Sequence, residues 1–134
     1  MRPDRIPPRA ITHPSIDLGN PALQASGLDG DGWLADTSSF TLFQPGISTS
    51  LVVRGMVPLV ADPAFTTELQ VLVDGQEVAR RTLGLGDFEL RANVTHSGHW
   101  ARQVELRFSA TQQLPAPDTR LVGARISFAG FEEN

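Results

Sequence analysis

Residues 69–83 read LQVLVDGQEVARRTL, and this stretch decides the fold class of the chain. Leu69, Val71 and Val73 occupy every second position, which places their side chains on one face of a strand. Asp74-Gly75 is a dipeptide typical of two-residue hairpins, because a type I′ turn needs a positive φ at both central residues. Residues 78–83 form the expected return strand. The stretch therefore predicts a β-hairpin with one buried face.

The same alternation continues to residue 128 and extends upstream of the hairpin. Strands are expected around residues 40–42 and 50–55, whereas Pro58 and Pro63 make residues 57–65 a loop or an edge. Several short strands without helical periodicity predict an all-β fold, an antiparallel two-sheet β-sandwich of jelly-roll type. The inward positions expected on the later strands are Phe88, Leu90, Ala92 and Val94, then Val104, Leu106 and Phe108, then Val122, Ala124, Ile126 and Phe128.

The chain divides into two segments of different composition. Five of its ten prolines lie within residues 1–21. Because proline fixes φ and removes an amide donor, residues 1–25 are expected to form a proline-rich extended arm. Residues 26–134 are expected to form the sandwich domain. Its last strand is expected to end at Phe128 and to leave an acidic tail, residues 132–134, in solvent.

Composition excludes several classes of protein. The 134 residues suit one domain, and the absence of cysteine excludes disulfides and thiolate zinc sites. A net charge of −4 argues against a nucleic-acid partner. No apolar run approaches the roughly 20 residues that span a bilayer, so membrane insertion is not expected. The first residues lack the apolar core of a signal peptide, and the localisation stays undetermined.

No recognisable catalytic centre is present in the sequence. His96 and His99 lie three positions apart beside Trp100, but no further metal ligand, nucleophile or orienting carboxylate stands at a recognisable spacing. They are interpreted as exposed loop histidines. Glu89 and Glu105 fall on the polar phase of their strands and are interpreted as solvent-facing. The chain is therefore expected to be non-catalytic.

Residues 29–32, Asp-Gly-Asp-Gly, resemble part of a calcium loop. Carboxylates that alternate with glycine can wrap a cation that prefers oxygen ligands. Asp29 and Asp31 lack the further ligands of a complete loop, so the preferred interpretation is a turn and no cofactor is expected. A structural calcium ion is the alternative.

Six residues are candidates for ligand binding. Trp33 and Trp100 fall in predicted loops, where an indole can stack on a sugar, although a large aromatic is more often part of a core. An Asp–Arg pair at the entry to the last strand can pin a loop to the sheet, which is the preferred interpretation, or can face sugar hydroxyls. The candidate set is Trp33, Asp36, Arg54, Trp100, Asp118 and Arg120.

The order of the motifs resembles a known class of domain. Asp31-Gly-Trp33 is followed by Leu-Val-Val-Arg54-Gly, then by Val73-Asp-Gly75, Gly86-Asp-Phe88 and finally Asp118-Thr-Arg120-Leu-Val-Gly123. Over residues 26–129 this is similar to the galactose-binding-like β-sandwich accessory domains of bacterial glycosyltransferases and cell-surface polysaccharide enzymes. In those domains leucine commonly precedes the last glycine, whereas Val122 stands here.

The resemblance implies a non-catalytic module of carbohydrate-binding type that works beside a sugar-transferring or polysaccharide-processing enzyme. Its expected partner is a glycan or a neighbouring catalytic domain. The alternative is a structural, oligomerisation or protein-interaction module with no sugar ligand, which would expose an apolar patch or pair an edge strand with another chain. In that case a homo-oligomer is one expected form.

Overall fold

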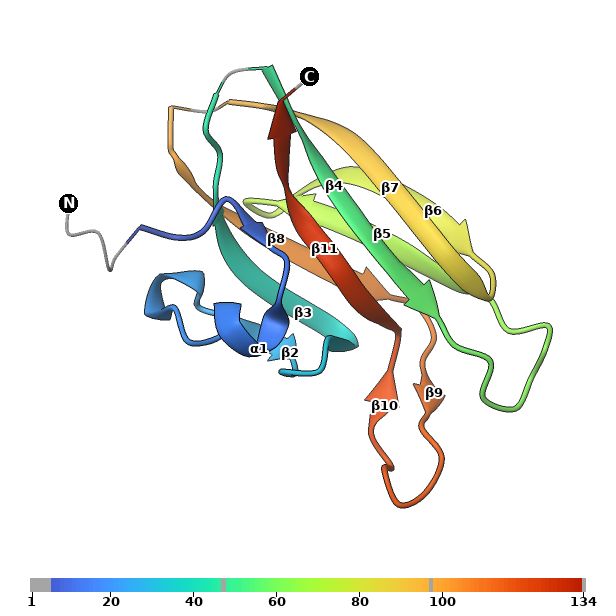
Figure 1. Ribbon diagram of the computed structural model, residues 1–134. Coiled ribbons are helices and arrows are strands. Elements are labelled where there is room, and N and C mark those ends of the chain that lie inside the picture. Colours follow the sequence, from blue (N-terminus) through green and yellow to red (C-terminus); the bar gives the residue numbers. More distant parts are fainter. Residues whose placement is uncertain (1–5, 47, 97, 134) are drawn as a thin grey trace.

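The computed structural model describes residues 6–46, 48–96 and 98–133, and its folded part consists of two layers of antiparallel strands (Figure 1). One layer has the strand order β6-β5-β8-β3 and the other β11-β4-β7, and a two-residue pairing between β3 and β11 joins them at a corner. The strands of the first layer are β3 (Trp33–Phe43), β5 (Thr67–Val73), β6 (Gln76–Leu83) and β8 (Ala101–Phe108). Those of the second are β4 (Ser48–Val57), β7 (Gly86–Thr95) and β11 (Ala124–Glu133).

The predicted all-β sandwich is confirmed. From β3 to β4, β4 to β5, β6 to β7, β7 to β8 and β8 to β11 the chain passes between the layers, as in a jelly roll. Asp74 and Gly75 have φ of 51° and 83°, so the β5–β6 hairpin turns as its sequence predicts. Residues 58–66, which carry Pro58 and Pro63, form the expected loop between β4 and β5. Among the described residues, no helix is long and apolar enough to cross a membrane.

The core lies between the two layers and is made of the side chains that alternate inward. In β8 and β7 the period of two holds, as the sequence predicts, and in β5 it holds from Thr67 to Val71, after which Leu72 is buried as well. The largest completely buried side chains are Phe40, Phe131, Ile11, Leu23, Leu34, Leu42, Leu51, Leu69 and Leu106. At roughly 2 kcal/mol for each large aliphatic or aromatic side chain, their burial is the main favourable contribution to folding.

The last strand departs from the prediction. The register of β11 on β4 shifts between Ile126 and Phe128, where a β-bulge inserts an extra residue. Phe128 consequently leaves the core face and lies opposite Arg54, and Ala129 and Phe131 take the next core positions. The expected inward position of Phe128 is wrong, because a strict period of two does not hold across a bulge. β11 also continues to Glu133, and Glu132 forms ion pairs on the sheet rather than lying in a solvated tail.

Residues 6–25 lie against the sandwich. Ala10–Ile11 forms β1, which pairs with Gly130 and Ala129 of β11. The short helix α1 (Pro14–Asp17) and the 3₁₀ turn Pro21–Leu23 follow, and β2 (Ser26–Leu28) then pairs with β3. Ile11 and Leu23 are completely buried. The described part of the proline-rich segment therefore contributes to the core and forms one border of the outer face of β11 and β4.

A small hairpin of β9 (Gln112–Gln113) and β10 (Leu121–Val122) projects from the end of the sandwich, with the proline loop at its tip (Figure 1). Gly123 then leads into β11 and packs directly on the ring of Phe108, where a Cβ would overlap the ring. The hairpin positions Asp118 and Arg120 beside the loop that precedes β3.

Candidate functional site

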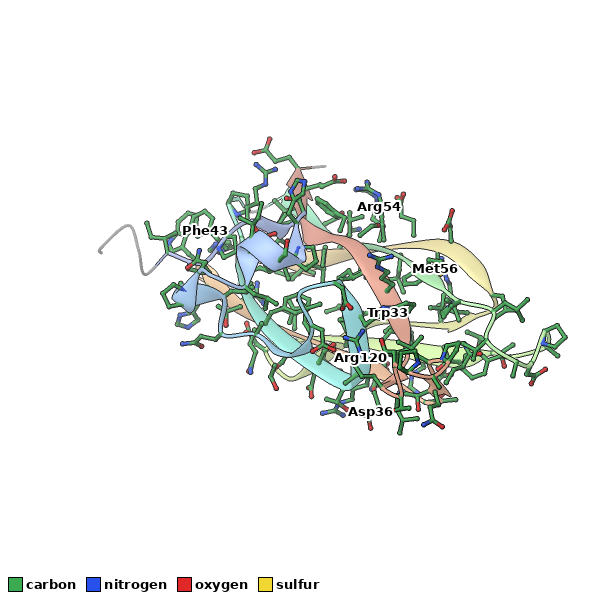
Figure 2. The ribbon with its side chains drawn as sticks, turned by 60° about the horizontal axis from the view of Figure 1, so that its bottom comes forward. Trp33, Asp36, Phe43, Arg54, Met56 and Arg120 are labelled. Carbon is green, nitrogen blue, oxygen red and sulfur yellow. The ribbon has the colours of Figure 1, made fainter. Side chains whose placement is uncertain are left out.

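A groove of about 840 Å³ lies on the outer face of β11, β4 and β7. Its floor is formed by β4 and β11, one wall by β7, and the other wall by residues 12–15 and 30–31. Arg54 and Met56 of β4 both point outward into it (Figure 2). The lining contains both charged and apolar side chains, which is suited to a ligand with both polar and apolar surfaces.

The side chains of the floor and of the β7 wall form rows that run across the three strands. Met56 lies directly opposite Asp87 on β7 and Arg125 on β11. Direct partners in an antiparallel sheet lie on the same face, so these three side chains project together. Asp87 makes no ion pair or side-chain hydrogen bond with another described residue. This row therefore presents a carboxylate whose acceptors are not used by any side chain or ion pair of the described residues.

The adjacent row is held by its own charges. Arg54 lies between Glu89 and Phe128, its Nε donates to Glu89 Oε2 at 3.1 Å, and its guanidinium carbon is 4.8 Å from the centre of the Phe128 ring. Glu132 accepts from Arg54 at 3.5 Å and from Arg91 at 3.0 Å. The hydrogen bond from Arg54 to Glu89 raises the pKa of Arg54 above its already high ordinary value. This row is a closed network that holds the three strands in register.

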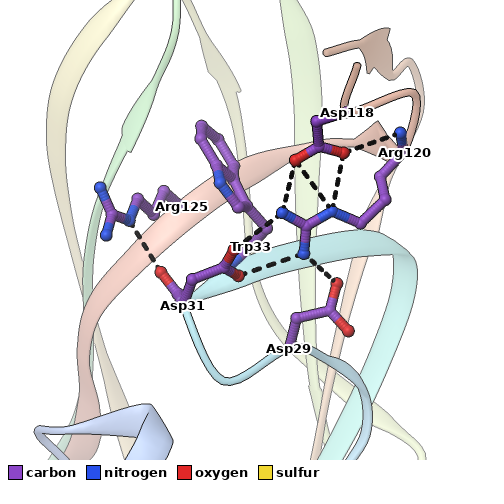
Figure 3. A network of polar contacts seen from close by, with 6 residues as sticks. All are labelled: Asp29, Asp31, Trp33, Asp118, Arg120 and Arg125. Carbon is purple, nitrogen blue, oxygen red and sulfur yellow. Dashed lines mark hydrogen bonds and ion pairs between the residues drawn. The ribbon is translucent and has the colours of Figure 1, made fainter. Parts of the chain in front are cut away.

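Arg125 connects the groove to the loop before β3. Its Nε donates to the main-chain oxygen of Asp31 at 2.8 Å, and its guanidinium carbon lies 5.8 Å from the centre of the Trp33 indole (Figure 3). No ion pair joins Arg125 to a carboxylate among residues 6–46, 48–96 and 98–133. Its remaining donors are therefore available to the groove.

Arg120 gathers three carboxylates behind the groove wall (Figure 3). Its Nη2 donates to Asp118 Oδ2 and to Asp31 Oδ2, both at 2.7 Å, and its Nη1 donates to Asp29 Oδ2 at 2.8 Å. These hydrogen bonds lower the pKa of Asp31 and of Asp118, and raise that of Arg120. The predicted Asp118–Arg120 pair therefore forms, and it also fixes the Asp29-Gly-Asp31-Gly loop.

The loop of residues 29–32 forms a turn in which Gly32 N donates to Asp29 O at 2.9 Å. Gly32 has φ of 94°, and a Cβ there would lie 2.8 Å from Ile126 O, so glycine is required by both backbone conformation and space. Within the described parts of the chain, no cluster of three or more His, Asp or Glu side chains could hold a metal ion. The carboxylates of Asp29 and Asp31 face a guanidinium.

Trp100 lies at the far end of the molecule from Trp33. Trp33 begins β3, so its predicted loop position is wrong. Phe43 ends the same strand and lies well apart from Trp33 (Figure 2). An extended strand of this length spans roughly 30 Å. Trp100 stacks on Phe43 with ring centres 5.6 Å apart and is 51% exposed. Together with Pro7 and Ala101 these rings line an apolar hollow of about 220 Å³. The two tryptophans do not share a groove.

Among known proteins, solved structures of low sequence identity resemble this chain in shape. No protein-family model and no curated protein sequence matches the chain. One similar solved structure is the CBM36-1 domain of a multidomain xylanase from the hindgut metagenome of Trinervitermes trinervoides, with 18% identity, a TM-score of 0.48, and coverage of 82% of this chain and 77% of that domain.

Another similar structure is a carbohydrate-binding module CBM36 in complex with calcium and xylotriose, with 19% identity, a TM-score of 0.43, and coverage of 73% and 74%. At these values the likenesses assign neither a family nor a ligand to this chain.

The structure brings some of the predicted residues together and separates others. Arg54 lies in the groove, whereas Asp118 and Arg120 lie behind its wall. Asp36 is exposed on β3, in the other layer, where its carboxylate accepts from Thr37 N at 2.8 Å. His96 packs edge-on against Trp100, with ring centres 4.9 Å apart.

Sequence reasoning missed Met56, Asp87 and Arg125 as lining residues, and it placed Glu89 on a solvated face without connecting it to a groove. A signal for these residues was present in the outward phase of β7, where Asp87, Glu89 and Arg91 alternate with the core positions. The phase alone does not show which residues of β4 and β11 lie beside them.

Proposed function

We propose that this chain is a non-catalytic carbohydrate-binding module, and that the groove over β4 and β11 is its ligand site. The observation that carries the proposal is the floor of the groove, where fixed hydrogen-bond donors and acceptors flank apolar surface. Arg54, Arg125, Asp87 and Glu89 offer both kinds of polar group around Met56. A saccharide ring presents hydroxyls at its rim and C–H groups on its faces, so it matches this arrangement.

The electrostatics favour binding over catalysis. A general acid needs a carboxyl pKa raised toward neutrality. The carboxylate of Asp31, on the groove wall, instead has a lowered pKa because it accepts hydrogen bonds from Arg120. Glu89 is paired with Arg54 and Arg91. Asp31 is therefore held ionised, and Glu89 is held in place by its ion pairs, which suits recognition of a sugar.

Each residue proposed from the sequence has a distinct place in this function. Arg54 borders the ligand site and keeps its ion pair with Glu89. Asp118 and Arg120 position the groove wall through Asp31, and Trp33 supports Arg125. The loop of residues 29–32 is held by Arg120 in this proposal and requires no calcium ion. Asp36 and Trp100 lie outside the proposed sugar site.

We also propose that the chain belongs to a bacterial protein and works beside an enzyme that transfers sugars or processes polysaccharide. The order of motifs over residues 26–129 supports it. A module of this kind would bring a catalytic domain to its glycan. Because the two domains are linked, binding of the first raises the effective concentration of the second at the glycan, so that together they bind more tightly than either does alone. Co-purification with a catalytic domain encoded on the same or a neighbouring gene tests this part.

Titration of the isotope-labelled protein with neutral trisaccharides of glucose, galactose, mannose and xylose tests the ligand site. We expect at least one sugar to shift the methyl resonance of Met56 and the amides of β4, β7 and β11 at millimolar concentration. Shifts confined to other surfaces would relocate the site, and no shift with any sugar, together with a negative glycan array, would refute the function.

A second candidate, a protein-interaction module, is favoured by the exposed Trp100, which lines an apolar hollow with the half-buried Phe43 and the buried Pro7. Such a surface would bury its tryptophan against a partner domain or a second copy. Light scattering and size-exclusion chromatography of wild type and Trp100→Ser test it. A dimer or complex that the substitution dissociates supports this function, and a monomer under all conditions, with no domain partner, counts against it.

A further inference from the structure

The row Asp87–Met56–Arg125 differs from the rest of the groove in having charges that no ion pair satisfies within the described chain. The neighbouring row, with Arg54 between Glu89 and Phe128, is occupied by its own ion pairs and by the cation–π contact. A ligand that enters the paired row must break existing contacts. One that enters the unpaired row gains hydrogen bonds without that cost.

The geometry of the row fixes the separation of its two charges. Met56 is the direct cross-strand partner of both Arg125 and Asp87, and neighbouring strands lie ~4.8 Å apart. The backbones of Arg125 and Asp87 are therefore roughly 10 Å apart, with the thioether of Met56 between them. Arg125 supplies hydrogen-bond donors on one side, and Asp87 supplies acceptors on the other. With the apolar side chain of Met56 between them, the row has room for one sugar ring.

Arg125 is held in place before any ligand arrives. Its Nε donates a hydrogen bond to Asp31 O, and its guanidinium lies over the Trp33 ring. Because the side chain is already held, it loses little conformational freedom when a ligand binds. Asp31 is in turn fixed by two hydrogen bonds from Arg120. The terminal nitrogens of Arg125 remain to donate to a hydroxyl pair.

We propose that Asp87, Met56 and Arg125 form a subsite for a single neutral pyranose ring, which lies over Met56, donates a hydroxyl to Asp87 and accepts hydrogen bonds from Arg125. This assignment rests on the proposed function and names the ligand class of that same groove. The two charges cancel, so the subsite as a whole attracts neither ion. A uronic acid gains at Arg125 what it loses at Asp87, and an amino sugar gains at Asp87 what it loses at Arg125, so a charge on the ring brings no net attraction. A charged ring also loses part of the hydration of its charge on binding, a cost that a neutral ring does not have.

Trp33 provides an optical signal for this subsite. In a Trp100→Phe background Trp33 is the remaining tryptophan, and a ligand on Arg125 changes the charge distribution above its indole. Methyl glucoside, methyl glucuronide and glucosamine share a ring and differ in charge, so they are suitable probes, together with the trisaccharide that gives the largest shifts in the titration described above. We expect the neutral probe to bind at least fivefold more tightly than either charged one.

Substitutions in the row separate the subsite from the function as a whole. Asp87→Asn and Arg125→Gln keep the approximate shape and remove a charge, and each is expected to weaken binding of the neutral probe about tenfold, as for the loss of a charged hydrogen bond. Glu105→Gln and Arg107→Gln are matched controls, because this exposed pair lies on β8 in the other layer. Their binding constants should equal that of wild type.

Four results are distinguishable. Loss of affinity in both row variants with a preference for the neutral probe supports the subsite. Binding at β4 and β11 that is unaffected by Asp87→Asn and Arg125→Gln overturns the subsite and leaves the function standing. Tighter binding of the glucuronide or of glucosamine also overturns it. No binding of any probe by folded wild-type protein overturns both proposals.

Discussion

Arg120 Nη2 donates to Asp31 Oδ2 at 2.7 Å, and this contact joins residues 89 positions apart in the sequence. It fastens the β9–β10 hairpin to the loop that forms one wall of the groove. Because the same Nη2 also donates to Asp118 Oδ2, a single guanidinium closes both loops. The geometry of the groove wall therefore depends on a residue that does not itself line the groove.

Arg120→Gln should lower Tm by a few degrees and loosen the groove wall. The substitution leaves three carboxylates facing one another without a neutralising charge, although their exposure to solvent limits the cost. Thermal unfolding at low and high salt measures the effect, and the difference from wild type should shrink as salt screens the network. Arg107→Gln, whose ion pair is local to β8, serves as the control. An unchanged Tm at low salt would contradict this account.

The same cluster should give the protein a characteristic loss of stability in acid. Hydrogen bonds from Arg120 lower the pKa of Asp31 and Asp118 in the folded state. Their contribution is therefore complete above the ordinary aspartate pKa of about 3.9 and is lost as pH falls through the lowered folded values. Denaturant unfolding between pH 7 and pH 2.5 should show a steeper acid loss for wild type than for Arg120→Gln. Parallel curves would show that the cluster is not linked to folding.

Asp74→Asn should destabilise the protein by about 1–3 kcal/mol. Asparagine also tolerates the left-handed backbone at this position, so the hairpin turn itself should survive. The loss comes from Arg102, whose Nε donates to Asp74 Oδ2 at 2.6 Å and whose side chain is only 7% exposed. Urea denaturation gives the change in free energy. A loss no larger than that of Asp62→Asn, in an exposed turn, would mean that Arg102 finds enough support from Gln44 and Thr95.

Leu23→Ala should cost about 2–5 kcal/mol, as for a completely buried leucine elsewhere. The residue belongs to the proline-rich segment, so the result measures how far residues 1–25 are part of the folded unit. Leu59→Ala is the control, since Leu59 is 65% exposed in the loop after β4. Equal stabilities of the two variants would support an independent sandwich that begins at residue 26.

The hairpin at residues 69–83 and the alternation in β7 and β8 could be predicted because both depend on local properties. Backbone pleating sets the period of two, and the conformational preferences of Asp and Gly set the turn. Phe128 could not be placed in this way. Its side chain changes face because of a bulge opposite β4, and the residues of β11 alone do not specify where that bulge falls.

The candidate site was predictable in part. Asp118 and Arg120 pair across two positions, which a short-range pattern can suggest. Their contact with Asp29 and Asp31, and the row of Asp87, Met56 and Arg125, join segments that are distant in the sequence. Nothing in the spacing of these residues indicates that they meet.

The sequence by itself determined that this chain forms an antiparallel sandwich, where its main hairpin turns and which face of most strands is buried. Only the tertiary structure decided which outward side chains stand side by side and where the groove lies. The reason is that the face of a side chain follows from local backbone geometry, whereas its cross-strand neighbours follow from the register of strands that pair over long distances.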